Sequence, residues 1–283
     1  MIDLHIHTTA TPHHSTWPPD VLVEQAIRAG LRAIAVTDHN STASVAAAQD
    51  AGVRLGLPVV SGVEIDSGFA AHGPSPIPIK LWHTLVYGAP PDHPELLALC
   101  ESVFTQNMAD AACLRETLAA RGFALPGLDD LGRPPNVADV GAALARHNLI
   151  ERQPGEDDEV TGMRYILTQI EGGYTPIGVD QIIAVAHRCG GLAILAHPGR
   201  SKGIYAIPAS AADIAAMAAC GLDGIEVFYP AHAAAEQARL RAIAEQHGLL
   251  ISGGSDSHHP HQPLASWPIE PFMPFLERVG VLQ

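Results

Sequence analysis

The feature that most constrains the fold is a repeated alternation of short apolar runs with helical patterns. It occupies residues 1–90 and resumes after residue 190. Seven of the apolar runs are predicted to be strands, at residues 1–7, 31–39, 57–65, 80–88, 191–199, 222–230 and 249–258. Strands that alternate with helices predict an α/β fold with a parallel sheet and crossover helices. Seven strands favour a barrel over an open sheet, although the count alone does not close one.

The middle of the chain has a different pattern, with helical spacing and almost no strand signal. A long helix is followed by glycine- and proline-rich loops and by two shorter helices, predicted at residues 138–148 and 160–171. We therefore expect residues 1–90 and 190–283 to form one barrel domain. Residues 91–189 are expected to form a helical insertion subdomain rather than a separate catalytic unit.

Composition limits the partners that this chain can have. Hydrophobic residues make up 47% and charged residues 16%, which is typical of a globular protein with a sizeable core. The formal net charge of -14 disfavours long duplex nucleic acid and anionic membranes as partners. The N-terminus lacks the basic and apolar regions of a signal peptide, and no apolar run reaches the roughly 18 residues of a membrane span. We expect a cytoplasmic protein.

Residues of metal-binding type lie in or directly after the predicted strands. His5 and His7 share one face of the first strand because side chains alternate with period two. The later strands contribute Asp38 and His39, Glu64, His83, His197, and Asp256 with His258. In a parallel barrel the carboxyl ends of the strands open on one face, where these side chains would meet. Each motif alone could be a helix cap, a turn or a surface ion pair, but their recurrence at successive strand ends favours a metal centre.

The types of ligand narrow the chemistry. Imidazole and carboxylate without thiolate are typical of Mn²⁺, Zn²⁺ or Fe²⁺ sites and argue against a structural zinc site of the cysteine type. With few carboxylates, a cluster of two or three divalent ions keeps a surplus of positive charge. Such a pocket favours a polyanionic substrate, and phosphate in particular.

Several side chains are candidates for contact with such a substrate. Arg200 directly follows the A-H-P-G sequence at the mouth of the fifth strand, where a guanidinium suits a phosphate. Lys202 and Tyr205 follow it closely, and Tyr229 ends the sixth strand. Arg133 in the insertion is a weaker candidate. The alternatives are a surface arginine in a loop and an aromatic residue at the barrel rim.

Taken together, the motifs resemble those of the PHP (polymerase and histidinol phosphatase) family. D-L-H-I-H-T, T-D-H-N, G-V-E-I, the strand with His83, A-H-P-G and G-S-D-S-H occur in the family's order, over about residues 1–90 and 190–260. The resemblance implies a distorted (β/α)7 barrel with two or three divalent metal ions, with Mn²⁺ favoured over Zn²⁺ or Fe²⁺. The first ion would be held by His5, His7, Glu64 and Asp256, the second by Glu64, His83 and His197, and the third by His39 and His258.

The resemblance also assigns roles outside this ligand set, and here the chain departs from the pattern. Asp38 is expected to orient a histidine. Many relatives have an aspartate in the loop after the first strand, but this chain has T-T-A-T-P-H-H-S-T-W there. His13 is therefore the expected third ligand of the third metal, with His14 nearly as well placed. Asp256 or His83 could accept a proton.

The helical insertion and the sequence G-G-L-A-I-L-A-H-P-G-R are similar to one branch of the family. That branch dephosphorylates nucleoside 3′,5′-bisphosphates such as pAp, and some members trim short RNA from the 5′ end. Its insertion usually carries G-R-P-H, whereas Gly132-Arg133-Pro134-Pro135 lacks the histidine. The sequence thus predicts a phosphatase of nucleotide metabolism. The alternatives are a 5′-3′ exoribonuclease on short oligonucleotides, a histidinol-phosphate phosphatase and a non-catalytic PHP binding module.

Overall fold

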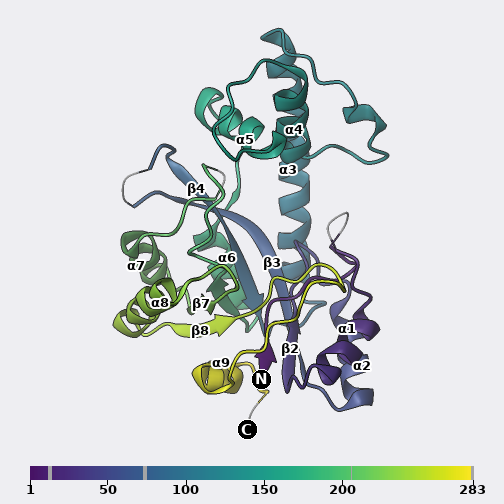
Figure 1. Cartoon of the computed structure of the whole chain (residues 1–283), viewed down its shortest axis with the longest axis vertical. Coiled ribbons are helices and arrows are strands. Elements are labelled where there is room, and N and C mark those ends of the chain that lie inside the picture. Colours follow the sequence, from purple (N-terminus) through teal and green to yellow (C-terminus); the bar gives the residue numbers. More distant parts are fainter. Residues whose placement is uncertain (12–14, 73–74, 205, 282–283) are drawn as a thin grey trace.

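The structure is a computed structural model that describes residues 1–11, 15–72, 75–204 and 206–281. Its strands are β1 (Ile2–Asp3), β2 (Ala33–Val36), β3 (Val59–Ala70), β4 (Ile79–Tyr87), β5 (Ile177–Gly178), β6 (Leu192–Leu195), β7 (Gly224–Phe228) and β8 (Leu250–Gly253). Its α-helices are α1 (Pro19–Arg28), α2 (Val45–Leu55), α3 (Pro94–Ala120), α4 (Val137–His147), α5 (Asp158–Gln169), α6 (Val179–Arg188), α7 (Ala211–Ala219), α8 (Ala234–His247) and α9 (Met273–Arg278). The α/β class, the seven predicted strands and both predicted shorter helices are confirmed (Figure 1).

Helix ends follow local sequence signals. Proline occupies the first turn of α1, where no intrahelical N–H partner is needed. Ser210 and Asp213 form a capping box at the start of α7. The helix α2 ends at Leu55 and is capped by Gly56, whose φ of +77° favours glycine or asparagine.

The sheet runs in the order β1-β2-β3-β4-β6-β7-β8, with β5 paired to β3. The parallel arrangement predicted from the sequence is wrong for β4, which is antiparallel to both β3 and β6. The physical reason is the short connection between Ala70 and Ile79. A parallel crossover needs about a dozen residues or more, so the chain turns back as a hairpin instead.

The two ends of the strand path, β1 and β8, approach each other without forming a ladder among the described residues, so the sheet is a distorted barrel that is not fully closed. Single backbone hydrogen bonds join the segments that follow these strands. Leu4 N donates to Gly253 O at 3.1 Å, Asp256 N to His5 O at 2.8 Å and His7 N to Ser257 O at 3.0 Å. These contacts place the two segments side by side.

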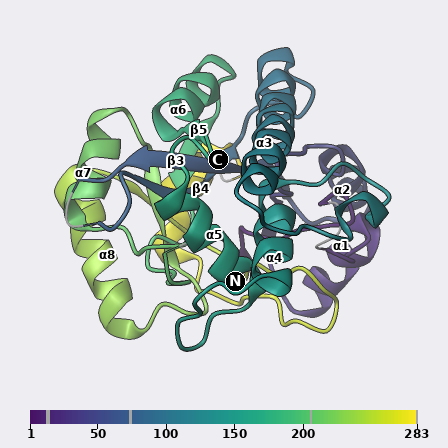
Figure 2. The same ribbon diagram turned by 90° about the horizontal axis from the view of Figure 1, so that it is seen from above.

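Helices cover the sheet on both sides and extend above it. Figure 2 shows α1 and α2 on one side of the sheet region, α7 and α8 on the other, and α4 and α5 between them at the near end. The helix α3 runs through both parts: Leu96 and Val103 pack in the main core, while Leu114 and Leu118 pack with α4 and α5 in a separate cluster (Figure 1). One continuous helix therefore links the two regions.

The division of the chain at residues 91 and 189 remains a prediction. Within that range, the separate cluster ends at Ile170, whereas Val179, Ile182 and Ile183 of α6 pack in the core of the sheet. Among the described residues, no helix combines the length and the hydropathy required to span a membrane.

Candidate metal centre

The first part of the site forms where the segments after β1 and β8 touch. A Cβ atom on Gly254 would lie 2.3 Å from the Cβ of His5, so the approach requires glycine. Two residues later, Asp256 lies beside the two histidines of the first strand. His7 Nε2 is 3.1 Å and His5 Nε2 is 3.6 Å from Asp256 Oδ1. His5 and His7 are fully buried and lie on one face, as the period-two pattern predicts.

Glu64 in β3 is the carboxylate around which the imidazoles gather, and it is fully buried. The imidazole atoms nearest to Oε2 are His5 Nε2 at 3.3 Å, His7 Nε2 at 3.2 Å and His39 Nδ1 at 3.3 Å, and those nearest to Oε1 are His83 Nδ1 at 2.9 Å and His197 Nε2 at 3.0 Å. His83 reaches Glu64 from the middle of β4 rather than from a strand end. The antiparallel hairpin makes this possible because it sets β4 directly beside β3.

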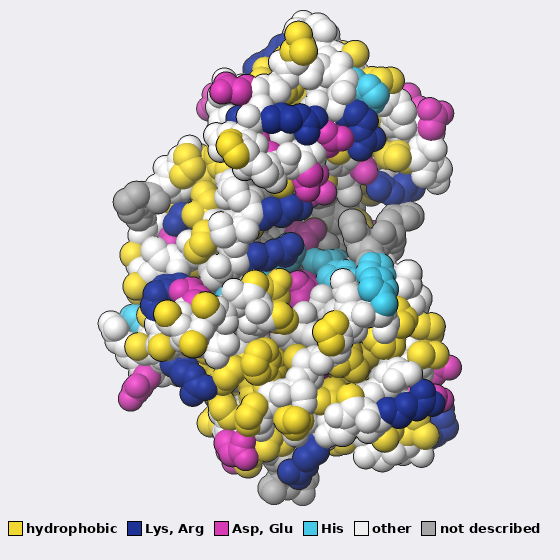
Figure 3. All heavy atoms as spheres, in the orientation of Figure 1, with side chains coloured by type: hydrophobic (Ala, Val, Ile, Leu, Met, Phe, Trp, Pro, Cys, Tyr) yellow, Lys and Arg dark blue, Asp and Glu magenta, His cyan; other side chains and the backbone are white. Residues whose placement is uncertain are grey.

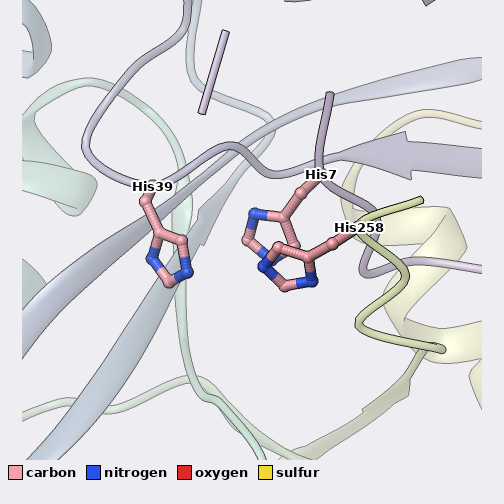
Figure 4. Close-up of side chains that lie close together, drawn as sticks. All are labelled: His7, His39 and His258. Atoms are coloured by element: carbon pink, nitrogen blue, oxygen red, sulfur yellow. The ribbon is translucent and has the colours of Figure 1, made fainter. Parts of the chain in front are cut away.

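A further group of imidazoles consists of His7, His39 and His258. Figure 4 shows the three rings turned toward a common space, each from a different segment of the chain. The ring centroids of His7 and His258 are 4.1 Å apart, and those of His7 and His39 are 4.5 Å apart. The Nδ1 atom of His258 lies 2.8 Å from the carbonyl oxygen of Asp256, which fixes the orientation of the ring.

Burial and charge pull the pKa values of the site in opposite directions. Burial alone would lower the pKa of His7, but the adjacent carboxylates of Asp256 and Glu64 raise that pKa to about 9. Burial alone would raise the pKa of Glu64, but the positive charges of neighbouring imidazoles hold it well below its usual value. Burial and the charge of His7 lower the pKa of His258 to about 4, so this imidazole stays neutral near pH 7.

These residues fit divalent metal ions. Three groups each offer ligand atoms within 4.8 Å of one another: His5, His7, Glu64 and Asp256; His39, Glu64 and His83; and His7, His39 and His258. Ligand atoms around one ion lie about 3 Å apart when metal–nitrogen distances are about 2 Å, which matches the contacts at Glu64. Within the described part of the site, two buried atoms, His39 Nδ1 and Glu64 Oε2, have no hydrogen-bond partner. Buried polar atoms normally have a partner, and a shared cation would supply one.

Backbone strain is also concentrated here. Among the described residues, the non-glycine residues with positive φ are Asn40 at 49°, His197 at 28° and Asp256 at 56°. Each belongs to the site or directly follows one of its histidines. Strain of this kind persists only where the surroundings enforce it, and it is typical of functional sites.

Asp38 differs from its predicted role. Among the described residues, its carboxylate accepts hydrogen bonds from Thr8 N at 2.5 Å, Thr8 Oγ1 at 2.7 Å, Thr11 Oγ1 at 2.7 Å and Ser44 Oγ. It reaches a histidine only through Thr11, whose hydroxyl lies 3.4 Å from His7 Nδ1. Asp38 therefore fixes the loop after His7 rather than a histidine directly.

Sequence reasoning missed two carboxylates that do contact histidines. Glu226 in β7 is fully buried, and its Oε1 lies 3.2 Å from His5 Nδ1. Asp66, opposite His83 in the β3–β4 ladder, has its Oδ1 3.6 Å from His83 Nε2 and 3.5 Å from His39 Nδ1. The sequence contained a sign of each. Glu226 is an acidic residue inside an apolar strand, and Asp66 stands two residues after Glu64 and therefore on the same face of β3.

Arg200 and Tyr229 lie beside the centre. The backbone N–H of Arg200 donates to His197 O at 2.9 Å, which closes a tight turn directly after that histidine. Burial and the charge of Asp256 raise the pKa of Tyr229, while the positive charge of Arg200 opposes this shift. The hydroxyl of Tyr229 donates to Asp256 Oδ2 at 3.2 Å.

Of the other candidate substrate contacts, Lys202 and Arg133 contact acidic side chains, and the rest lie outside the described residues. Lys202 Nζ is 3.4 Å from Glu159 Oε1 of α5, so this loop meets the helical insertion. Arg133 forms two hydrogen bonds with Asp139 near the start of α4, at 2.6 and 2.9 Å. His13, His14 and Tyr205 lie outside the described residues.

The surface above the centre is hollowed. Figure 3 shows a depression between the helical part at the top and the sheet region below it. Histidine side chains lie on its lower wall, and lysine and arginine side chains lie along one side.

The chain is similar to known proteins over most of its length. The profile of the family described as PHP domain matches residues 3–112. The chain is 31% identical to the 5′-3′ exoribonuclease Rnm of Escherichia coli, covering 91% of this chain and 85% of that protein. It is 30% identical to the 3′,5′-nucleoside bisphosphate phosphatase of Chromobacterium violaceum, with coverage of 92% and 87%. It is 29% identical to the phosphoribosyl 1,2-cyclic phosphate 1,2-diphosphodiesterase of Eggerthella lenta, with coverage of 90% and 93%.

Solved structures share the fold. A structure from Bifidobacterium adolescentis described as a metal-dependent phosphoesterase aligns over 98% of this chain and 96% of its own, with a TM-score of 0.68 and 24% identity. A structure described as an amidohydrolase from Chromobacterium violaceum, with bound SO4 and no metal, aligns over 99% and 96% with a TM-score of 0.67 and 26% identity.

Proposed function

The chain belongs to the PHP family, and from this we propose that it is a metal-dependent phosphoesterase that removes the 3′-phosphate of nucleoside 3′,5′-bisphosphates such as pAp. The products would be the nucleoside 5′-monophosphate and phosphate. The observation that carries the proposal is the convergence of imidazoles on the buried Glu64, with Arg200 beside them. The bisphosphate phosphatase relative, 30% identical over 87% of its length, supports this substrate.

Cation binding is the first role that we assign to the site. Divalent ions bound there would supply Lewis acidity and lower the pKa of water. The proposed ligands in the three groups are His5, His7, His39, Glu64, His83, Asp256 and His258. His197, whose Nε2 lies 3.0 Å from Glu64 Oε1 but which belongs to none of these groups, is a further proposed ligand, and His13 or His14 is one more. We propose two or three ions per chain and Mn²⁺ as the working metal, since imidazole and carboxylate ligands suit it.

Proton transfer is the second role. Asp256 and His83 are the proposed proton acceptors, because both belong to the centre and both are partly open to solvent, with 12% and 24% of the side chain exposed. The hydroxyl of Tyr229 donates a hydrogen bond to Asp256 Oδ2 and so holds that carboxylate in place. The exposed part of His83 allows exchange of the proton with water.

Arg200 is the proposed contact for the second, non-reacting phosphate. Glu226 and Asp66 lie against the imidazoles and add two negative charges to those of Glu64 and Asp256. Bound cations would therefore leave a smaller surplus of positive charge than the sequence predicts. A second phosphate therefore needs a cationic side chain of the protein. Burial lowers the pKa of His83, Glu64 raises it and the positive charge of Arg200 lowers it, which supports a guanidinium close enough to act on the centre.

A cleavage assay with Mn²⁺ tests the proposed substrate. It follows released phosphate for monoesters and, by chromatography, the nucleotide or sugar-phosphate products for diesters. The assay compares pAp, mononucleotides, short 5′-phosphorylated RNA and a ribosyl cyclic phosphate at equal concentration. We expect the largest kcat/KM for pAp. Faster cleavage of short RNA would instead favour the exoribonuclease alternative, which the 31% identity to Rnm supports. A metal-loaded protein that cleaves none of them would be a binding module.

Arg200→Ala is expected to lower kcat/KM for pAp by about tenfold to a hundredfold. A hydrogen bond to a charged group contributes roughly 1.5–3 kcal/mol, and each 1.4 kcal/mol is tenfold. Turnover of a small aryl phosphate, which has no second phosphate, should change much less. The measurement is the ratio of the two kcat/KM values.

Arg28→Ala provides a matched control for this ratio. Arg28 lies in the last turn of α1 and pairs with Glu24 on the surface, with 66% of its side chain exposed. Removing the Arg28 side chain should leave kcat/KM unchanged for both pAp and the aryl phosphate. If Arg200→Ala slows both substrates equally, Arg200 has no role in recognising the second phosphate.

A further inference from the structure

Glu226 is a buried acid for which the proposed reaction has no direct use. It lies in the middle of β7, a strand that is buried along its whole length, and its own exposure is 0%. A carboxylate in such a position is costly unless its oxygens have partners. Both oxygens do have partners here, and both partners belong to the proposed metal ligands.

The first partner is the side chain of His5. Its Nδ1 lies 3.2 Å from Glu226 Oε1 and 3.4 Å from Oε2, while its Nε2 lies 3.3 Å from Glu64 Oε2. A neutral imidazole has one N–H and one lone pair. A carboxylate beside Nδ1 keeps the proton on that atom, so the lone pair of Nε2 faces the cluster.

The second partner is the backbone of His197. Its N–H donates to Glu226 Oε2 at 2.7 Å, and its φ of 28° is in a region that non-glycine residues rarely adopt. A buried N–H without an acceptor costs about 1–3 kcal/mol, so Glu226 stabilises this strained turn. The turn in turn holds His197 Nε2 at 3.0 Å from Glu64 Oε1.

We propose that Glu226 is a positioning residue that sets two neighbouring histidines of the centre, His5 through its ring and His197 through its backbone, for cation binding. Glu226 itself contacts neither cation nor substrate in this assignment. The inference rests on the proposed function because it takes both histidines as ligands. It adds a reason why an acid occupies a fully buried strand.

Glu226→Gln tests the proposal through metal affinity, measured by titration calorimetry with Mn²⁺ and by metal content after dialysis. We expect binding to weaken about 10–100-fold, the loss typical of groups that orient metal ligands. Phosphate release should recover as Mn²⁺ is raised, because the ligands themselves remain. Glu226→Asp keeps the charge and should recover part of the affinity relative to glutamine, and it decides the matter if the glutamine variant does not fold.

Asp223→Asn is a closely matched control. Asp223 precedes the same strand and also contacts one imidazole and one backbone N–H, His187 Nε2 at 2.8 Å and Ala193 N at 2.9 Å, but neither belongs to the centre. Its substitution should leave Mn²⁺ affinity unchanged. Equal affinity in wild type and both Glu226 variants, or an equal loss in Asp223→Asn, would overturn the positioning role. A wild type that binds no divalent cation would instead refute the proposed function.

Discussion

Replacing Glu64 with glutamine is expected to remove cation binding and phosphoesterase activity together. Five imidazoles surround this one carboxylate, and its oxygens belong to two of the three candidate cation groups. Glutamine has nearly the same shape but lacks the negative charge, and its amide nitrogen would face an imidazole or a cation as a donor.

The loss of Mn²⁺ affinity and of activity should exceed the 10–100-fold reduction that is typical when a residue that only orients a metal ligand is replaced. Mn²⁺ per chain after dialysis and the initial rate of phosphate release are the two measurements. Circular dichroism should show that the variant remains folded, since the hydrophobic core of the sheet is unchanged. Excess Mn²⁺ should fail to restore the rate, in contrast to the recovery expected for Glu226→Gln.

Glu24→Gln is the matched control, because Glu24 forms a surface pair with Arg28 and 52% of its side chain is exposed. The Glu24→Gln protein should keep the Mn²⁺ content and the initial rate of phosphate release of the wild type. A Glu64→Gln protein with wild-type metal content and normal turnover would show that this carboxylate is not part of a catalytic metal centre. Retained metal with lost activity would narrow its role to the reaction itself.

Seven strands could be predicted from the sequence, but the short strand β5 and the direction of β4 were not. Apolar runs identify buried strands whichever way they point, so β4 was assigned to a parallel sheet. The few residues between Ala70 and Ile79 contained the missing information, since a crossover does not fit into so short a connection. The error did not disturb the site, because His83 reaches Glu64 across the hairpin.

The histidines of the site were predictable because they stand in or directly after strands, where period-two spacing and strand topology bring them together. The residues that orient them were not predicted in this way. Asp38 stands beside His39 in the sequence but bonds to Thr8, Thr11 and Ser44, and only the folded loop after His7 reveals this. Sequence proximity identifies which residues can be ligands, whereas their supporting hydrogen bonds depend on contacts between distant segments.

Replacing Lys80 with alanine is expected to destabilise the protein by about 3–5 kcal/mol, because it leaves a buried carboxylate without its cation. Lys80 in β4 is 1% exposed, and its Nζ lies 2.7 Å from Asp213 Oδ2 of α7, which is also fully buried. Chemical denaturation of the metal-free protein measures the change. Arg115→Ala, which breaks the exposed pair with Asp129, should cost less than about 1 kcal/mol. Lys80→Met combined with Asp213→Asn should recover much of the loss, since neither charge remains buried. A Lys80→Ala protein as stable as Arg115→Ala would mean that water reaches Asp213 and solvates it.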